Sequence, residues 1–176
     1  MKEQHYQQLQ EHVLTETLDN GLKVVMIPKE NYHKTFAVLT TPFGSLDRHF
    51  KINNSEVIDI PSGTAHFLEH KLFEKESEDA FKRFGELGAD ANAFTTAYQT
   101  SYLFSTTDNF ELSLVHLLDF VQTPYFSLQT IAKEQGIIGQ EIQMYEDDPN
   151  WIVYMGLLQI LYPKSPLADD IEIGRA

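Results

Sequence analysis

The first half of the chain alternates apolar and polar residues in short runs, as β-strands do. Residues 13–18 and 22–27 form two such runs on either side of Asp19-Asn20-Gly21. The Asn-Gly pair tolerates the positive φ angles of a tight turn, so the pattern predicts a β-hairpin. A third strand is predicted over residues 35–41, ended by Pro42 and Gly44, and a second hairpin over residues 47–60, turning at Asn53-Asn54-Ser55.

Helical spacing of apolar residues dominates the second half. It predicts helices over residues 79–87, from an Asp108 cap to about residue 121, from about Ser127 to Glu146, and from the break at Asp147-Asp148-Pro149 to Leu161. Residues 91–98 and 101–106 are rich in threonine and aromatic residues, which favours two further strands. Strands followed mainly by helices indicate an α+β fold.

A helix beginning at Pro61-Ser62, with Ser62 as its N-cap, would carry His66, Glu69 and His70. Residues four apart lie about 40° apart around a helix, so both imidazoles can reach one metal ion while the carboxylate reaches a water on it. The H-x-x-E-H order is the inverzincin signature. The flanking apolar residues also allow a buried helix whose histidines are incidental.

Two histidines leave a zinc site incomplete, and the chain has no cysteine to add. The long predicted helix offers Glu134 and Glu141, which are two turns apart and therefore share a face within about 20°. That face also carries Ile131, Ile137 and Ile138. Carboxylates inside an apolar stripe need a positive partner, such as a divalent ion. A solvated helix with glutamates at the edge of its stripe is the alternative.

Composition narrows the class of protein. The chain has 176 residues, enough for one sizeable domain, and a formal net charge of −13. This acidity argues against nucleic-acid binding. The polar residues 1–10 lack the apolar core of a signal peptide, and no apolar run reaches the roughly 18 residues that span a bilayer. With the missing cysteines, these features predict a cytoplasmic protein that does not enter membranes.

The sequence resembles the first domain of the M16, or insulinase and pitrilysin-like, zinc peptidases. Three motifs carry the resemblance in the family's order: Gly63 to Phe73, Ala91-Asn92-Ala93-Phe94-Thr95, and Glu134-x6-Glu141. The likeness is strongest to the bacterial YmfH-like subgroup, related to mitochondrial processing peptidase, and it extends from the first hairpin to about Ile171. It implies an antiparallel or mixed sheet with helices packed on one face.

The resemblance also implies roles for particular residues. His66, His70 and Glu141 would bind Zn²⁺, Glu69 would act as general base, and Glu134 would support the site and be needed for full activity. Asn92 and Ala93 would lie on an edge strand that holds an extended peptide. The implied function is a zinc-dependent endopeptidase that hydrolyses peptides or small proteins through an activated water.

Family members have two homologous halves, each of two α/β domains. We therefore expect residues 1–176 to form a single N-terminal zinc-binding domain, truncated near Gly174-Arg175-Ala176, with the remaining domains absent and little activity of its own. A catalytically inactive subunit or scaffold is the alternative function, and pairing as a homodimer or with another M16-like subunit is the expected assembly. A lyase of the S-ribosylhomocysteine type shares the histidine motif but requires a cysteine ligand.

Overall fold

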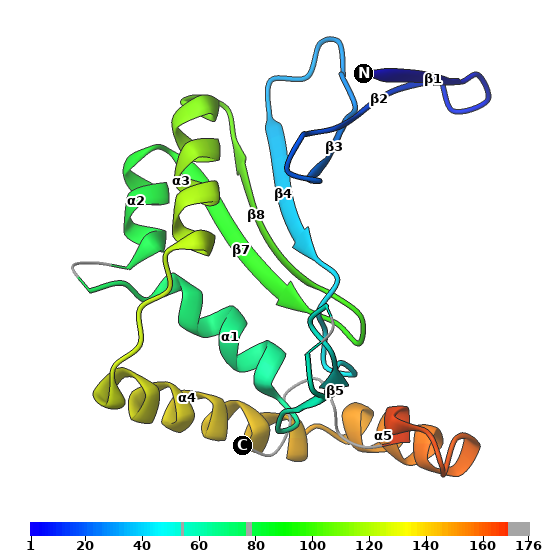
Figure 1. Cartoon of the computed structure of the whole chain (residues 1–176), viewed down its shortest axis with the longest axis vertical. Helices are drawn as coiled ribbons and strands as arrows, with labels where there is room; N and C mark the ends of the chain where they lie inside the picture. The colour runs from blue at the N-terminus through cyan, green and yellow to red at the C-terminus, as the bar shows by residue number, and fades with distance from the viewer. Residues whose placement is uncertain (54, 77–78, 169–176) are drawn as a thin grey trace. The chain divides into compact units, whose positions relative to one another are not determined.

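The computed structural model describes residues 1–53, 55–76 and 79–168 (Figure 1). The chain divides into two compact units, Met1–His33 and Lys34–Ala176. The hydrophobic pattern does not indicate this boundary, and the single-domain organisation stays a prediction. The expected truncation concerns residues 174–176, which lie outside the described part.

The first unit is a three-stranded antiparallel sheet in the order β1-β2-β3, made of β1 (Lys2–Tyr6), β2 (Glu11–Thr17) and β3 (Lys23–Met26). The hairpin expected around residues 19–21 joins β2 to β3, and Gly21 has a φ of 88° in its turn. Strand β1 was not predicted, because its sequence is polar throughout and all five of its residues are exposed.

The second unit is built on an antiparallel sheet in the order β4-β8-β7, formed by β4 (Thr35–Thr41), β7 (Ala89–Thr95) and β8 (Thr100–Thr106). Helices α1 (Thr64–Phe73), α2 (Ala80–Glu86) and α3 (Phe110–Gln122) cover one face of it (Figure 1). The α+β class with helices on one face is thereby confirmed. Strand β7 lies at an edge of this sheet, so one side of its backbone is free to pair.

The core lies between the sheet and these three helices. It consists mainly of aromatic side chains and includes Phe73, Phe84, Tyr102, Phe104, Leu117 and Phe120. The apolar side chains of Phe36, Val38 and Phe94, also on the sheet, are 41–59% exposed. The core therefore fixes α1 against β7 and β8, which sets the position of the histidine motif relative to the edge strand.

The remaining elements are β5 (His49–Phe50), β6 (Ile58–Asp59), α4 (Leu128–Glu146), α5 (Pro149–Leu161) and a short 3₁₀ helix, Pro166–Ala168. The second hairpin is confined to the two residue pairs of β5 and β6, and Asn54 of its predicted turn lies outside the described residues. Among the described helices, none combines the length and the apolar character needed to cross a bilayer.

Two predicted helix caps are wrong by one residue. Gly63, not Ser62, is the N-cap of α1, and Asn109, not Asp108, is the N-cap of α3. Both observed caps have left-handed backbones, with φ of 82° at Gly63 and 51° at Asn109. Glycine and asparagine enter this conformation most readily, so the turn geometry decides which residue occupies the cap.

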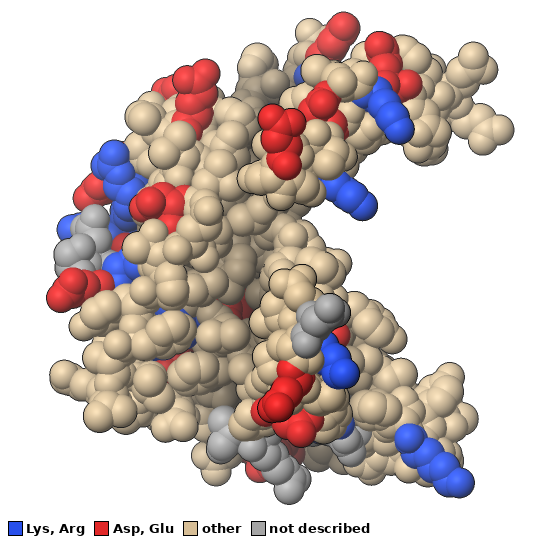
Figure 2. Space-filling model, in the orientation of Figure 1, with Lys and Arg blue, Asp and Glu red and all other residues tan. Residues whose placement is uncertain are grey.

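The surface carries charges of both signs. Lys and Arg side chains stand among Asp and Glu side chains on the face drawn in Figure 2, without a continuous basic stripe there. In the whole sequence, 26 acidic residues outnumber 13 basic ones. The absence of nucleic-acid binding stays a prediction, supported by this charge balance.

Candidate metal centre

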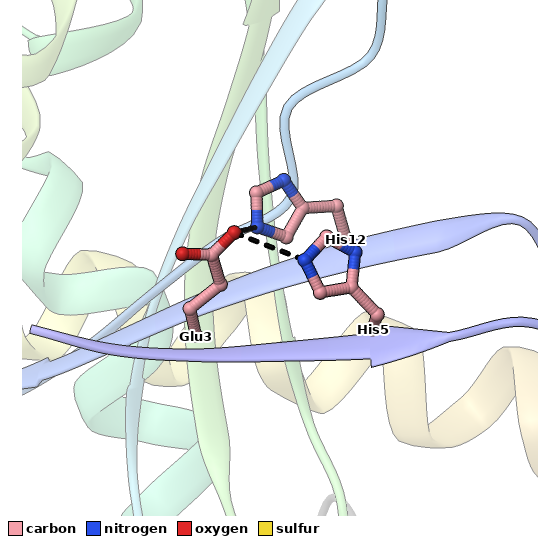
Figure 3. Close-up of side chains that lie close together, drawn as sticks. All are labelled: Glu3, His5 and His12. Carbon is pink, nitrogen blue, oxygen red and sulfur yellow. Dashed lines mark hydrogen bonds and ion pairs between the residues drawn. The ribbon is translucent and has the colours of Figure 1, made fainter.

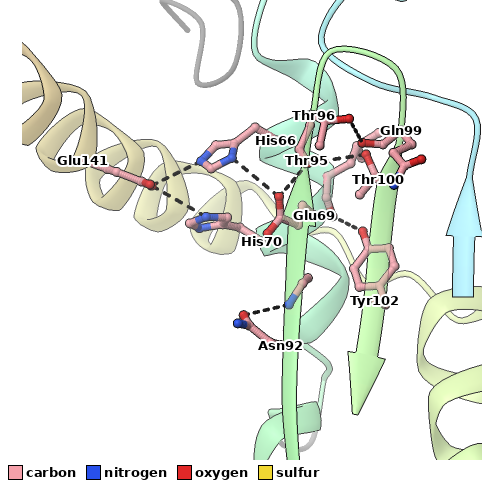
Figure 4. Close-up of polar contacts among 12 residues, drawn as sticks. His66, Glu69, His70, Asn92, Thr95, Thr96, Gln99, Thr100, Tyr102 and Glu141 are labelled. Carbon is pink, nitrogen blue, oxygen red and sulfur yellow. Dashed lines mark hydrogen bonds and ion pairs between the residues drawn. The ribbon is translucent and has the colours of Figure 1, made fainter. Parts of the chain in front are cut away.

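Helices α1 and α4 bring three predicted metal ligands to one point (Figure 4). His66 Nε2 lies 3.2 Å from Glu141 Oε2, and His70 Nε2 lies 3.7 Å from the same oxygen. One ligand atom from each residue falls within 4.8 Å of the other two. The ring centroids of the two histidines are 4.5 Å apart, as their spacing of four residues on one helix requires.

The spacing of these atoms fits a zinc ion. Zinc bonds to nitrogen and oxygen are about 2.0–2.2 Å long, so neighbouring ligands of a tetrahedral ion lie about 3.3–3.5 Å apart. The separations of 3.2 and 3.7 Å bracket that range. Two imidazoles and one carboxylate are also the ligand types of a catalytic zinc site, which keeps its fourth position open. His66, His70 and Glu141 would hold the ion.

Glu134 contacts the His70 imidazole at Nδ1, the ring nitrogen other than the one near Glu141. Its Oε1 accepts a hydrogen bond from His70 Nδ1 at 2.9 Å, and its side chain is buried. A carboxylate at Nδ1 keeps the proton there, which leaves Nε2 with a free lone pair directed at Glu141. Glu134 therefore orients His70 and does not itself reach the group of ligand atoms.

The buried stripe of α4 follows the predicted face with one exception. Glu134 and Ile138 are buried, Ile131 and Glu141 are half-buried, but Ile137 is 43% exposed. Ile137 lies about 60° from Glu134 and about 40° from Glu141 around the helix, so it occupies the exposed edge of this face.

Glu69 lies beside the ligands without joining them. Its Oε2 is 3.6 Å from His66 Nδ1, wider than a hydrogen bond, and accepts a 2.6 Å hydrogen bond from Thr95 Oγ1 (Figure 4). Thr95 also contacts Thr100 Oγ1 at 3.4 Å, and Thr100 Oγ1 donates to the Phe43 carbonyl at 2.8 Å. Each hydroxyl group has one proton, which Thr95 gives to Glu69 and Thr100 gives to Phe43, so Thr95 is the hydroxyl group that holds the carboxylate against the end of β7.

The sequence alone predicts no role for Thr95. The strand pattern could have indicated one, because Thr95 follows Ala93 by two residues and therefore lies on the same face of the sheet. Which helix residue that face meets depends on how α1 packs on β7, and this is not visible in the strand itself.

The carboxylates change the acidity of their neighbours. Burial alone would lower the pKa of His66, but Glu69 and Glu141 outweigh it and raise that pKa above its ordinary value. A metal ion at His66 therefore has to displace a proton that is held more firmly than usual. Burial, with a smaller contribution from Glu69, raises the pKa of Tyr102, so the phenol stays neutral at physiological pH.

A buried ion pair joins the C-terminal end of α1 to α4. Lys71 has no exposed surface, and its Nζ donates to Glu74 Oε2 at 2.6 Å. The other Glu74 oxygen lies 3.6 Å from Lys133 Nζ on α4. Through Lys133, the pair thus links the helix that carries both histidines to the helix that carries Glu134 and Glu141.

Asn92 and Ala93 lie on edge strand β7, and Figure 4 shows Asn92 apart from the cluster of ligands. The Ala93 amide donates to the Asn92 side-chain oxygen at 2.8 Å, and Asn92 is exposed. The Ala93 amide, whose hydrogen-bond partner is the exposed Asn92 side chain, thus lies two residues before Thr95, whose side chain contacts Glu69.

Comparison with known proteins finds relatives that are named zinc proteases. The family model described as Insulinase (Peptidase family M16) matches residues 59–173. The chain is 50% identical over 167 residues to the "Uncharacterized zinc protease YmfH" of Bacillus subtilis, covering 94% of this chain and 39% of that protein.

Solved structures agree with this match. The fold superimposes on a "putative M16-like peptidase" from Alicyclobacillus acidocaldarius with a TM-score of 0.87 and 41% identity, over 93% of this chain and 38% of that one. It is also similar to a protease from Helicobacter pylori, with a TM-score of 0.67 over 84% of this chain and 35% of that one. At 23% identity, the second likeness concerns the fold alone.

Proposed function

Because the chain belongs to the insulinase family of peptidases, family M16, we propose that it supplies the catalytic metal centre of a zinc-dependent endopeptidase. The convergence of His66, His70 and Glu141 within 4.8 Å, next to the uncoordinated carboxylate of Glu69, carries this proposal. The chain covers only 39% of the length of the Bacillus relative. The peptidase activity that we propose is therefore that of a longer, complete protein.

Each residue has a separate task in this mechanism. Zinc held by His66, His70 and Glu141 would supply a Lewis acid that acidifies a water molecule and polarises a carbonyl group. Glu69 takes the proton of the attacking water and returns it to the leaving amine. Thr95 holds the Glu69 carboxylate during both transfers, and Glu134 keeps the lone pair of His70 Nε2 available.

The substrate is an extended peptide segment, free or in a small protein. Strand β7 has one unpaired edge, and a peptide lying along it would receive the Ala93 amide hydrogen bond that Asn92 now accepts. Because Thr95 ends β7 and contacts Glu69, a peptide paired with this strand passes the general base. Backbone hydrogen bonds of this kind position the scissile bond and depend little on the amino-acid sequence of the substrate.

The test combines zinc content with cleavage of a mixed library of unstructured peptides. We expect the full-length gene product to cleave the library with zinc bound, and His66→Ala and Glu141→Gln to lose both zinc and cleavage. His33→Ala is the matched control, since His33 is exposed and distant in sequence from the motif. We also expect the 176-residue chain to bind zinc but to turn over peptides poorly.

Two outcomes would contradict the proposal. If the zinc-loaded full-length product cleaves none of the peptides, the centre belongs to an inactive subunit or scaffold. If His66→Ala and Glu141→Gln keep their zinc, these residues are not the ligands.

A further inference from the structure

We infer that Glu3, His5 and His12 form a second binding site, for a divalent transition-metal ion, in the N-terminal unit. The Nε2 atoms of both histidines converge on one oxygen, Glu3 Oε1, at 3.0 Å from His5 and 2.5 Å from His12 (Figure 3). One ligand atom from each residue lies within 4.8 Å of the other two. This site is independent of the proposed peptidase centre and uses none of its residues.

The backbone of the first unit creates this convergence. His5 of β1 and His12 of β2 are directly opposite each other in the antiparallel ladder. Glu3 precedes His5 by two residues and therefore points to the same face of the sheet. The two imidazoles stack with centroids 4.3 Å apart and planes within 8°. The β-ladder thus holds all three side chains on one face before any ion binds.

Glu3 differs from the neighbouring carboxylates because its described contacts include no ammonium group. The two carboxylates of the neighbouring strand β2 have cationic partners: Glu11 is paired with Lys29 and Glu16 with the N-terminal ammonium. The described contacts of Glu3 are with the two imidazoles only. A divalent ion among these three side chains would bond to one atom of each and balance the charge of the carboxylate.

The ligand set defines the class of ion. Imidazole nitrogens with one carboxylate suit Zn²⁺, Ni²⁺ and Cu²⁺, whereas Mg²⁺ and Ca²⁺ take oxygen ligands. The side chains of Glu3, His5 and His12 are 54%, 65% and 36% exposed, so water would complete the coordination sphere.

Zinc titration of the intact 176-residue chain, in competition with a chromophoric chelator, tests the site. We expect two equivalents of Zn²⁺ in the wild-type chain and loss of one in His12→Ala and in Glu3→Gln. The exposed His33 of the same unit provides the control, and His33→Ala should keep both equivalents. A millimolar excess of Mg²⁺ should displace neither. In a His66→Ala background, the equivalent that remains should disappear when His12→Ala is added.

Imidazole NMR signals of the wild-type chain provide a readout that needs no variant. Zinc should shift the ring resonances of His5 and His12 together, at a stoichiometry beyond that which shifts His66 and His70. Zinc uptake that His12→Ala leaves unchanged, or His5 and His12 signals that zinc does not move, would overturn the inference. Neither result bears on peptide cleavage, so failure here is distinguishable from failure of the proposed function.

Discussion

Two clusters in this chain contain the same kinds of ligand, two histidines and a glutamate, but in opposite surroundings. In the cluster on α1 and α4, His66 is 9% exposed, and a second carboxylate, Glu134, holds His70 at Nδ1. In the cluster on β1 and β2, His5 is 65% exposed, and within the described residues no hydrogen bond reaches Nδ1 of either ring. The ligands are alike, and the support behind them differs.

Metal binding and catalysis have different structural requirements in these two clusters. Convergent side chains are enough to hold an ion, and a β-ladder provides them as well as a helix does. Water activation also needs a positioned base beside the ion, and in the proposed mechanism Glu69, held by Thr95, is that base in the helical cluster, whereas the contacts described for the strand cluster include no further carboxylate. We therefore expect the helical cluster to catalyse hydrolysis and the strand cluster to bind a metal ion without catalysing a reaction.

Replacing the base while keeping the ligands should have the largest effect. Glu69→Gln in the full-length gene product should lower turnover of unstructured peptides by about 10²–10⁴-fold, because it removes proton transfer. Zinc content should stay unchanged, since Glu69 lies outside the group of ligand atoms. Glu146→Gln, an exposed change on α4, serves as the control. Loss of zinc from Glu69→Gln comparable to that from His66→Ala would show that Glu69 is a ligand.

Breaking the buried ion pair should disrupt the scaffold of the helical cluster. Glu74→Gln leaves the ammonium of fully buried Lys71 without its anion and should lower the free energy of unfolding by about 3 kcal/mol. Lys71→Met replaces the charge by an apolar chain of similar size and should change that energy by less than about 1.5 kcal/mol. Urea denaturation at pH 7 compares the two, and an equal loss in both variants would contradict the ion-pair account.

The same pair predicts a dependence on acid. Partial burial alone would raise the pKa of Glu74, but Lys71 and Lys133 outweigh it and lower that pKa in the folded chain. Its contribution to stability is therefore complete above the unfolded pKa of 4.5 and is lost as pH falls through the lower folded value. Lys71→Met should lose less stability over this acidic range than the wild type, as measured by denaturation at a series of pH values.

The sequence predicted those features of the fold that depend on local patterns. Strand β4 was predicted with its observed bounds, Thr35–Thr41, because Pro42 cannot continue the ladder. The long helix was predicted because its apolar stripe repeats over five turns, and Ser127 caps it. Strand β1 was not predicted, because its pairing with β2 is made by the backbone and leaves no apolar pattern in the residues.

The candidate sites, too, could be predicted only where they depend on a local sequence pattern. His66 and His70 share one turn of a helix, so their convergence could be predicted from spacing alone. His5 and His12 converge only because the residues between them turn back, and the sequence of that turn contains no proline or glycine. The Thr95–Glu69 contact joins a strand to a helix 26 positions earlier, and no local pattern encodes such a distance.

Removing the support behind His70 should make the helical cluster resemble the strand cluster. Glu134→Ala frees the imidazole to rotate and to change tautomer, so zinc affinity should fall by about 10–100-fold. Gln135→Ala, at the next and exposed position of α4, should leave affinity unchanged. Chelator competition measures both variants. An unaltered zinc affinity in Glu134→Ala would assign the 2.9 Å contact to packing of α4 only.

The smallest effect is expected from Thr95→Val, which removes the hydroxyl group that positions Glu69 and keeps the shape of the side chain. A hydrogen bond to a charged group contributes about 1.5–3 kcal/mol, and water can replace part of it, so turnover should fall about tenfold. KM and zinc content should change little, because Thr95 contacts neither the ligand atoms nor the β7 edge at Ala93.

Two further variants separate positioning from packing at this residue. Thr95→Ser keeps the hydroxyl group and should restore most of the turnover, whereas a packing role would need the methyl group that serine lacks. Thr96→Val alters the neighbouring threonine, whose hydroxyl group contacts Gln99 and Tyr98 and not Glu69, and should behave as the wild type. If Thr95→Val loses no turnover, or if serine fails to rescue it, Glu69 is held by the packing of α1 against the sheet, and the Thr95 hydroxyl group has no part in catalysis.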